Sequence, residues 1–137
     1  MIPKELFLSH SSQDHLKVEE VAETLRNHGI PTWFSSTNIM GAQQWHDEIG
    51  NALKRCDWFI ILLSPGSVHS RWVKSELVYA LNHNQYENHI LPVVIEDCNY
   101  EDLSWTLGMF EMISLKANKI EGYRNLLRTW GIGYREV

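Results

Sequence analysis

A tryptophan and a glutamate four residues apart are the pair in this sequence best placed to do chemistry. Trp72 and Glu76 lie in a segment of helical periodicity and fall on one face of the helix, with Tyr79 a further turn along. A carboxylate bordered by apolar residues is where perturbed acidity and function are found. The same spacing also fits an exposed glutamate that pairs with Lys74 or Arg71. Helical spacing alone leaves both interpretations open.

A second group of polar residues follows the short apolar run 6–8. Ser9, His10 and Ser11 begin a loop rich in hydroxyls and backbone N–H donors just before a helical segment, which suits a phosphate. The loop is not a P-loop, because it lacks the Gly-x4-Gly-Lys pattern, and no Gly-x-Gly-x-x-Gly occurs in the sequence. An ordinary solvated loop between a strand and a helix is the alternative.

Short apolar runs alternate with segments of helical periodicity along the chain. The run 58–63, six consecutive apolar residues, suits a central parallel strand buried on both faces. Pro92 favours a place for its strand away from the most densely bonded part of the sheet. Residues 99–108 are poorly periodic and predict a short helix at most. The expected strands are 6–8, 30–34, 58–63, 90–95 and 110–114.

Helices are expected between and after these strands. The first stops at Asn27-His28-Gly29, a common helix ending, the third covers 70–83, and the last ends near Gly131. The apolar residues expected to face the core are, helix by helix, Val18, Val21, Ala22 and Leu25; Trp45, Ile49, Ala52 and Leu53; Val73, Leu77, Ala80 and Leu81; and Ile120, Tyr123, Leu127 and Trp130.

Five strands alternating with helices predict an α/β fold, a parallel sheet with helices on both faces. The flavodoxin-like order 2-1-3-4-5 is expected for a five-stranded chain of this length. In such a sheet ligands bind beyond the carboxyl ends of the strands, where the strand order reverses. This rule brings together the loops 9–13, 35–44 and 64–70.

Length and composition narrow the function further. The 137 residues predict one domain over 1–137, and the formal charge of −5 argues against a nucleic-acid partner. The seven histidines are scattered, so no metal site is expected, and Cys56 and Cys98 are expected to serve packing. No segment approaches 18 apolar residues, so we expect a cytoplasmic protein with no membrane partner.

In their order and spacing, these pieces resemble a Toll/interleukin-1 receptor (TIR) domain, and the resemblance spans nearly the whole chain. It extends to the bacterial members that cleave NAD, whose mark is the Trp-x-x-x-Glu kept here as Trp72 and Glu76. The other matching residues are Leu6 to Ser11 with Asp14; Thr32 to Phe34, then Gly41 and Trp45; and Phe59 to Pro65, then Ser70 and Leu77.

The resemblance implies roles for particular residues. Glu76 is implied as the catalytic glutamate, and Trp72 would lie under the nicotinamide or another ring of the dinucleotide. NAD is then the substrate, and neither a cofactor nor a metal is expected. The implied substrate-binding residues are Ser9, His10, Ser11, Phe34, Ser35, Trp45, Trp72 and Lys74.

The chemistry explains why one carboxylate is enough. Ordinary glycosidases use two, one of which protonates a poor leaving group. The nicotinamide of NAD is already a pyridinium and departs without protonation, so a single anion near the oxocarbenium-like ribose can stabilise and orient it. Water as acceptor gives ADP-ribose, whereas an internal hydroxyl or an adenine nitrogen gives a cyclic form.

Part of the sequence departs from the family pattern. Ser35 stands where many members have an acidic residue. Residues 36–41 correspond to the family's BB loop, which often contains a Pro-Gly or acidic-Gly pair; of this pair only the glycine, Gly41, is present here. By resemblance the neighbour's BB loop completes the nucleotide site in an oligomer, and Ile39, Met40 and Gly41 are the expected assembly contacts, to copies of this chain or to other TIR domains.

Competing functions remain open at this stage. An NAD glycohydrolase or cyclase would make a diffusible signal in immune or antiphage defence. A non-catalytic adaptor would instead signal through TIR–TIR contacts. A deoxyribosyltransferase-like domain would favour free nucleosides over NAD. A receiver domain is set aside, because Ser9 and Ser64-Pro65 occupy the places of its acidic residues.

Overall fold

The fold is a five-stranded parallel sheet in the order β2-β1-β3-β4-β5. The structure is a computed structural model that describes residues 2–35 and 42–136, and side chains of 42–45 lie outside the description. The strands are β1 (Leu6–Ser9), β2 (Thr32–Trp33), β3 (Trp58–Leu63), β4 (Ile90–Val94) and β5 (Ile113–Ser114). The predicted fold class and strand order are confirmed.

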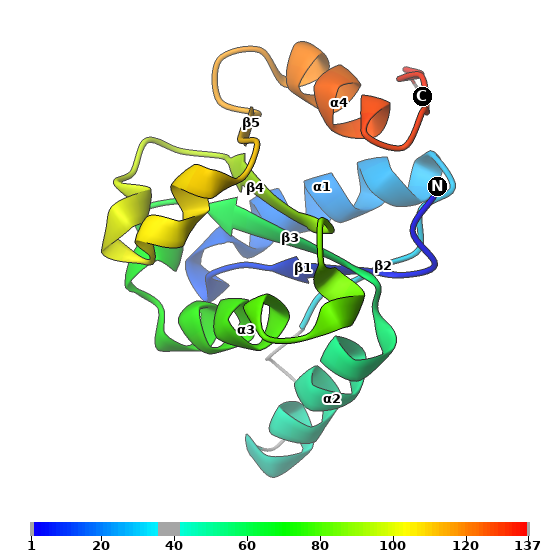
Figure 1. Ribbon diagram of the computed structural model, residues 1–137. Helices are drawn as coiled ribbons and strands as arrows, with labels where there is room; N and C mark the ends of the chain where they lie inside the picture. Colours follow the sequence, from blue (N-terminus) through cyan, green and yellow to red (C-terminus); the bar gives the residue numbers. More distant parts are fainter. Residues whose placement is uncertain (1, 36–41, 137) are drawn as a thin grey trace.

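Within residues 2–35 and 42–136, four α-helices cover the sheet on both faces, and the first three of them connect successive strands. They are α1 (His15–Asn27), α2 (Ala42–Arg55), α3 (Arg71–Leu81) and α4 (Lys119–Arg128). Helices α1 and α4 lie on one face, and α2 and α3 lie on the other (Figure 1). None of the helices within the described ranges is long and apolar enough to cross a membrane.

The two central strands divide their side chains between the two layers. Leu6 and Leu8 of β1 pack with α1 and α4, whereas Phe7 packs with α2 and α3. Strand β3 alternates in the same way, and all six of its residues are buried. Successive side chains of a strand point to opposite faces of the sheet. Because helices cover both faces here, the side chains on both faces are apolar.

Strand β2 is shorter than the predicted run 30–34. Gly29, with a φ of 83°, ends α1 in a left-handed conformation, and Pro31 cannot donate a ladder hydrogen bond. The Pro31 carbonyl still accepts from the Leu6 backbone N–H at 2.8 Å. The ladder itself therefore starts only at Thr32. Strand β5 is likewise limited to two of the five residues predicted.

Pro92 lies inside β4, which has a neighbouring strand on each side. The N–H groups that face β3 come from odd-numbered positions, as the bond from Ile95 to the Leu63 carbonyl illustrates. The Pro92 nitrogen therefore faces β5, whose pairing begins only at Val93. The missing N–H of Pro92 therefore removes no ladder bond. The sequence favoured a position away from the densely bonded part of the sheet, and this holds on the β5 side of the strand but not on the β3 side.

The third helix begins and ends differently from the predicted 70–83. The Ser70 hydroxyl accepts from the Val73 backbone N–H at 3.2 Å and caps α3, which ends at Leu81. Leu81 is 39% exposed, so its assignment to the core is wrong, because the chain leaves the sheet there. Ile120 is also exposed, at 41%, at the start of α4. Residues 99–108 hold two short 3-10 helices, Tyr100–Asp102 and Trp105–Met109.

Candidate functional site

A buried carboxylate lies where the strand order reverses. Glu76 on α3 is only 7% exposed, and its Oε1 accepts a hydrogen bond of 2.6 Å from the hydroxyl of Ser9, the last residue of β1. Strand β1 has β2 on one side and β3 on the other, so Ser9 marks the switch point of the sheet. The helix-face carboxylate and the hydroxyl loop predicted separately from the sequence therefore meet.

The acidity of Glu76 is strongly perturbed. Burial raises the pKa of Glu76 to about 7, and the hydrogen bond from Ser9 opposes this rise. Lys74 and Arg71 are exposed, and within the described ranges Glu76 forms no ion pair. The alternative of an exposed, ion-paired glutamate is therefore wrong for the geometry. At neutral pH the carboxyl group can be either protonated or charged, which suits a group with a role in a reaction.

Buried hydroxyls and one carboxylate tie the loop after β1 to the loop after β3. The Ser64 hydroxyl donates to the Asp14 carboxylate, and Ser67 donates from its hydroxyl to the Ser64 carbonyl at 3.2 Å. A Cβ atom on Gly66 would come within 2.9 Å of the Ser11 hydroxyl. The close approach of the two loops therefore favours glycine at position 66. The hydrogen bond from Ser64 to Asp14 joins the same two loops near Ser9.

His10 and Phe34 form a second part of the site at the end of β2. The His10 ring lies edge-on to Phe34, with ring centroids 5.9 Å apart. Burial lowers the pKa of His10, which favours the neutral form of the ring. The Arg26 guanidinium carbon lies 5.4 Å from the centre of the Phe34 ring, and Arg26 also donates to the Thr32 carbonyl at 2.6 Å.

Arg26 is a positively charged residue beside Phe34 that the sequence did not indicate. It stands in the last turn of α1, eight positions before Phe34, and no motif includes it. Its place beside Phe34 arises only because α1 returns along the sheet toward β2. No feature of the sequence could have indicated this contact.

Trp72 lies one turn before Glu76 on α3 and is far more exposed than Glu76. Its side chain is 45% exposed and its ring is T-shaped against His46 of α2, with centroids 5.9 Å apart. A hollow of about 510 Å³ is lined there by His69, Arg71, Trp72 and Ser75. This space is open to a planar ligand beside the aromatic ring. Lys74 is exposed on the same helix but does not line the hollow.

The remaining predicted site residues are described in part or not at all. Ser35 is half-buried at the end of the described stretch after β2. The side chain of Trp45 and the assembly residues Ile39, Met40 and Gly41 lie outside the described residues. In the described part of the chain, no group of three or more His, Cys, Asp or Glu side chains could hold a metal ion.

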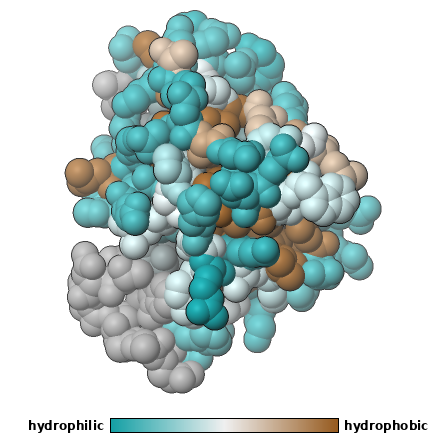
Figure 2. Space-filling view, turned by 90° about the vertical axis from the view of Figure 1, so that its left-hand side faces the viewer, coloured by the Kyte–Doolittle hydropathy of each residue, from teal (hydrophilic) through white to brown (hydrophobic). Residues whose placement is uncertain are grey.

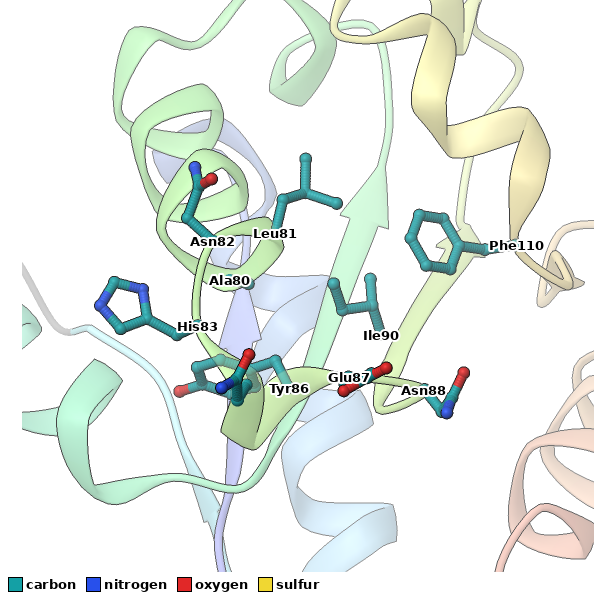
Figure 3. A pocket seen from close by; sticks show the side chains of 10 residues that line it. Ala80, Leu81, Asn82, His83, Tyr86, Glu87, Asn88, Ile90 and Phe110 are labelled. Carbon is teal, nitrogen blue, oxygen red and sulfur yellow. The ribbon is translucent and has the colours of Figure 1, made fainter.

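A separate hollow of about 520 Å³ lies at the other end of α3. Leu81, Ile90 and Phe110 point toward one another across it, with Glu87 and Asn88 at its margin (Figure 3). Ile90 begins β4, so this hollow is at the amino ends of the strands. It contains none of the predicted site residues, and ligands of parallel sheets bind at the opposite edge. Chemistry and topology therefore favour the site at Glu76.

The carboxyl edge of the sheet, which faces the viewer in Figure 2, has a mixed surface. Hydrophilic side chains cover its upper part, over α4, and hydrophobic surface forms separate patches lower down. Trp105 and Met109, which follow β4 in the chain, are 71% and 75% exposed. No single apolar surface dominates this edge, and the candidate site is marked by its buried carboxylate.

Comparison with known proteins identifies the family. The family model described as TIR domain matches residues 6–127. The 2' cyclic ADP-D-ribose synthase BtTIR of Bacteroides thetaiotaomicron is 30% identical over 74 residues. That match covers 53% of this chain and 26% of the relative, so the chain spans about a quarter of the relative's length.

Solved structures share the fold. The TIR domain of the Toll-related receptor TRR-2 from Hydra magnipapillata has a TM-score of 0.73 and 17% identity, over 90% of this chain and 95% of that one. The TIR domains of the activated Roq1 resistosome, which recognises the pathogen effector XopQ, have a TM-score of 0.70 and 16% identity, over 92% and 98%. With the family match over most of its length, the chain belongs to the TIR domain family.

Proposed function

We propose that this protein cleaves the nicotinamide–ribose bond of NAD and that Glu76 is the catalytic carboxylate. The observation that carries the proposal is the buried Glu76, hydrogen-bonded to Ser9 at the switch point of the sheet. The relative named as a 2' cyclic ADP-D-ribose synthase supports NAD as the substrate class. Burial of this kind is costly for a carboxylate, and such sites occur where function requires them.

The reaction needs one anion and no acid. The glycosidic bond breaks with its electron pair passing to the pyridinium, which leaves as neutral nicotinamide. The Glu76 carboxylate stabilises the positive charge that develops on the ribose, and Ser9 holds that carboxylate in place. Water then adds to the sugar and releases a proton, giving ADP-ribose; a ribose hydroxyl or adenine nitrogen adds instead to give a cyclic product.

The substrate's own charge helps to ionise Glu76. Burial raises the pKa of Glu76 to about 7. A bound pyridinium cation favours the charged form of a neighbouring carboxylate and lowers this pKa. As the ring leaves neutral, that stabilisation passes to the cationic ribose. The same anion therefore serves both the bound substrate and the transition state.

The other proposed substrate contacts are residues near the carboxyl ends of β1 and β2 and on the exposed side of α3. Ser11 and the backbone N–H groups after β1 would meet the phosphates, with His10, Phe34 and Ser35 along the neighbouring strand end. Trp72, with Lys74 nearby, would contact a ring or phosphate from the solvent side, and Trp45 is included by resemblance.

Assembly and biological role complete the proposal. We assign self-association to the BB loop, with Ile39, Met40 and Gly41 as contacts that complete a neighbour's site. The product would serve as a signal in immune or antiphage defence, in the cytoplasm.

Nicotinamide release from NAD tests the proposal directly. The purified protein is incubated with NAD at low and high concentration, with and without a crowding agent, and products are identified by mass spectrometry. We expect nicotinamide with ADP-ribose or a cyclic isomer, none from Glu76→Gln, and unchanged activity from Glu87→Gln, an exposed glutamate in the hollow at the other end of α3. Absence of nicotinamide under every condition, with an intact biological effect in Glu76→Gln, would establish a non-catalytic assembly module.

A further inference from the structure

A narrow cleft lies between α1 and α4, away from Glu76. It has a volume of about 220 Å³ and opens beyond the carboxyl ends of β4 and β5, the strands that precede Ile95 and Leu115. Its apolar lining includes Val21 and Leu115, which are 3% and 5% exposed, and the ring of Tyr123, which is 5% exposed. The apolar floor is therefore part of the core, already formed without a ligand.

Three lysines stand around this apolar floor. Lys17 comes from the first turn of α1, Lys116 from the segment after β5, and Lys119 from the start of α4. The chain as a whole carries a formal charge of −5, so its overall field repels anions. Three lysines from separate segments therefore meet at one small cleft, together with the carboxylate of Glu20.

Two of these lysines already contact carboxylates. Lys119 lies 3.0 Å from Glu20, which also lines the cleft, and Lys116 pairs with Asp97. The lysine side chains in these pairs are 63% and 42% exposed. Exposed ion pairs contribute little to stability, and each ammonium has three donors. An incoming anion can therefore share or replace these carboxylates at small cost.

We propose that the cleft binds a small amphipathic anion, with an aromatic or short aliphatic body on the apolar floor and its carboxylate or phosphate among Lys17, Lys116 and Lys119. The volume admits about one ring and is too small for a whole dinucleotide, so the ligand differs from NAD. Apolar burial and charge pairing act on the two ends of one molecule, which selects against ions and neutral rings alike.

The first test compares probes that carry one or both features. Binding of phenyl phosphate and phenylacetate is measured by calorimetry and by NMR shifts, beside inorganic phosphate and benzyl alcohol. We expect at least one of the two amphipathic anions to bind tenfold or more tightly than either control, and the tighter one identifies the acid group preferred. The proposal would be overturned if neither phenyl phosphate nor phenylacetate bound more tightly than inorganic phosphate and benzyl alcohol.

Two substitutions at one ion pair give opposite expectations. Lys119→Gln removes a cation and should weaken binding about tenfold, whereas Glu20→Gln releases that cation and should strengthen binding at least threefold. Lys54→Gln, an exposed lysine on α2, is the matched control and should leave affinity unchanged. Equal effects of Lys119→Gln and Lys54→Gln would contradict the assignment.

Binding here is independent of NAD cleavage, so the two proposals fail separately. Glu76→Gln should bind the amphipathic probe as tightly as the unmodified protein, because Glu76 does not line this cleft. Loss of probe binding in Glu76→Gln would place the probe beside Glu76 and overturn the inference, whatever the outcome of the nicotinamide experiment.

Discussion

At the scale of single residues, the environment of Glu76 governs its chemistry. A carboxylate that is 7% exposed has lost most of its water, and the Ser9 hydroxyl at 2.6 Å replaces only part of that solvation. Its pKa therefore rises to about 7. The charged form that serves the reaction is the form that burial disfavours. As pH rises, the rate of the reaction should therefore rise, whereas the free energy of unfolding should fall.

Activity should rise with pH through about 7. If ionised Glu76 is the working form, kcat/KM for NAD follows the fraction of free enzyme in which this carboxyl is charged, with an acidic limb near its pKa of about 7. The measurement is kcat/KM from pH 5 to 9 at constant ionic strength. A profile that is flat between pH 5 and 8 would contradict an essential carboxylate with this pKa.

Ser9→Ala should move this limb to higher pH. The hydrogen bond from Ser9 lowers the pKa of Glu76, so its removal raises that pKa and reduces the charged fraction at neutral pH. A hydrogen bond to a charged group is worth about 1.5–3 kcal/mol, so kcat/KM at pH 7 should fall roughly tenfold or more. Ser12→Ala, an exposed serine in the same loop, is the control and should match the unmodified protein at every pH.

Glu76→Gln should stabilise the fold at alkaline pH. The folded-state pKa of about 7 exceeds the ordinary value of 4.5, so the folded state holds the proton more tightly. The stability that the protonated group contributes is fully present below about pH 4.5 and is lost as pH rises through about 7. Glutamine stays neutral. Its advantage should therefore grow by about 2–3 kcal/mol from pH 5 to pH 8, measured by urea unfolding. An advantage independent of pH would show that Glu76 is not buried as described.

At the scale of elements, helices and loops meet the sheet where small residues allow it. Gly66 lets the loop after β3 approach Ser11. Gly122 of α4 lies against β5, where an added Cβ would meet the Ser114 carbonyl and come within 2.6 Å of a Leu115 methyl carbon. Gly50 of α2, in contrast, has no atom within 4 Å of an added Cβ. Two glycines inside helices thus have opposite packing environments.

Substituting these two helical glycines should change stability in opposite directions. Gly122→Ala forces α4 away from the backbone of β5 and should lower the free energy of unfolding by about 1–3 kcal/mol. Gly50→Ala gains helix propensity in open space and should raise it by about 0.5–1 kcal/mol. Chemical denaturation of both variants measures the pair. A stabilising Gly122→Ala would show that α4 and β5 are not packed this closely.

At the scale of the whole molecule, the strand order brings distant segments to one edge of the sheet. Ser9 and Glu76 are 67 positions apart, and Lys17 and Lys116 stand about a hundred positions apart around the second cleft. Glu76 stands on α3, and the lysine cleft lies between α1 and α4. The two proposed sites therefore have no residue in common.

Activity should rise faster than in proportion to protein concentration. We proposed that a neighbour's BB loop, residues 36–41, completes the nucleotide site, so the active species is an oligomer populated by mass action. The specific rate of nicotinamide release is measured over a hundredfold dilution series beside light scattering. Glu76→Gln should assemble like the unmodified protein. A specific rate that stays constant down to high dilution would show that one copy suffices.

Local sequence patterns predicted most of the fold, because burial on one or both faces dictates the spacing of apolar residues. The continuous apolar run of β3 and the helical spacing of Val73 and Leu77 both describe the structure correctly. Element ends were less predictable. Leu81 follows the same spacing but lies where α3 leaves the sheet, and β2 loses residues to the backbone of Gly29 and Pro31.

The sequence by itself determined the fold class and the face of the helix that carries Glu76, since both depend on the local periodicity of apolar residues. The strand order was expected from the usual order of five-stranded sheets of this kind, and the structure has that order. Only the tertiary structure decided that Ser9 donates to Glu76, that Arg26 lies on Phe34, and that three lysines surround one apolar cleft. Such contacts depend on where each element ends and how deeply it packs. Burial, and with it the raised pKa of Glu76, is a property of the assembled layers rather than of any segment.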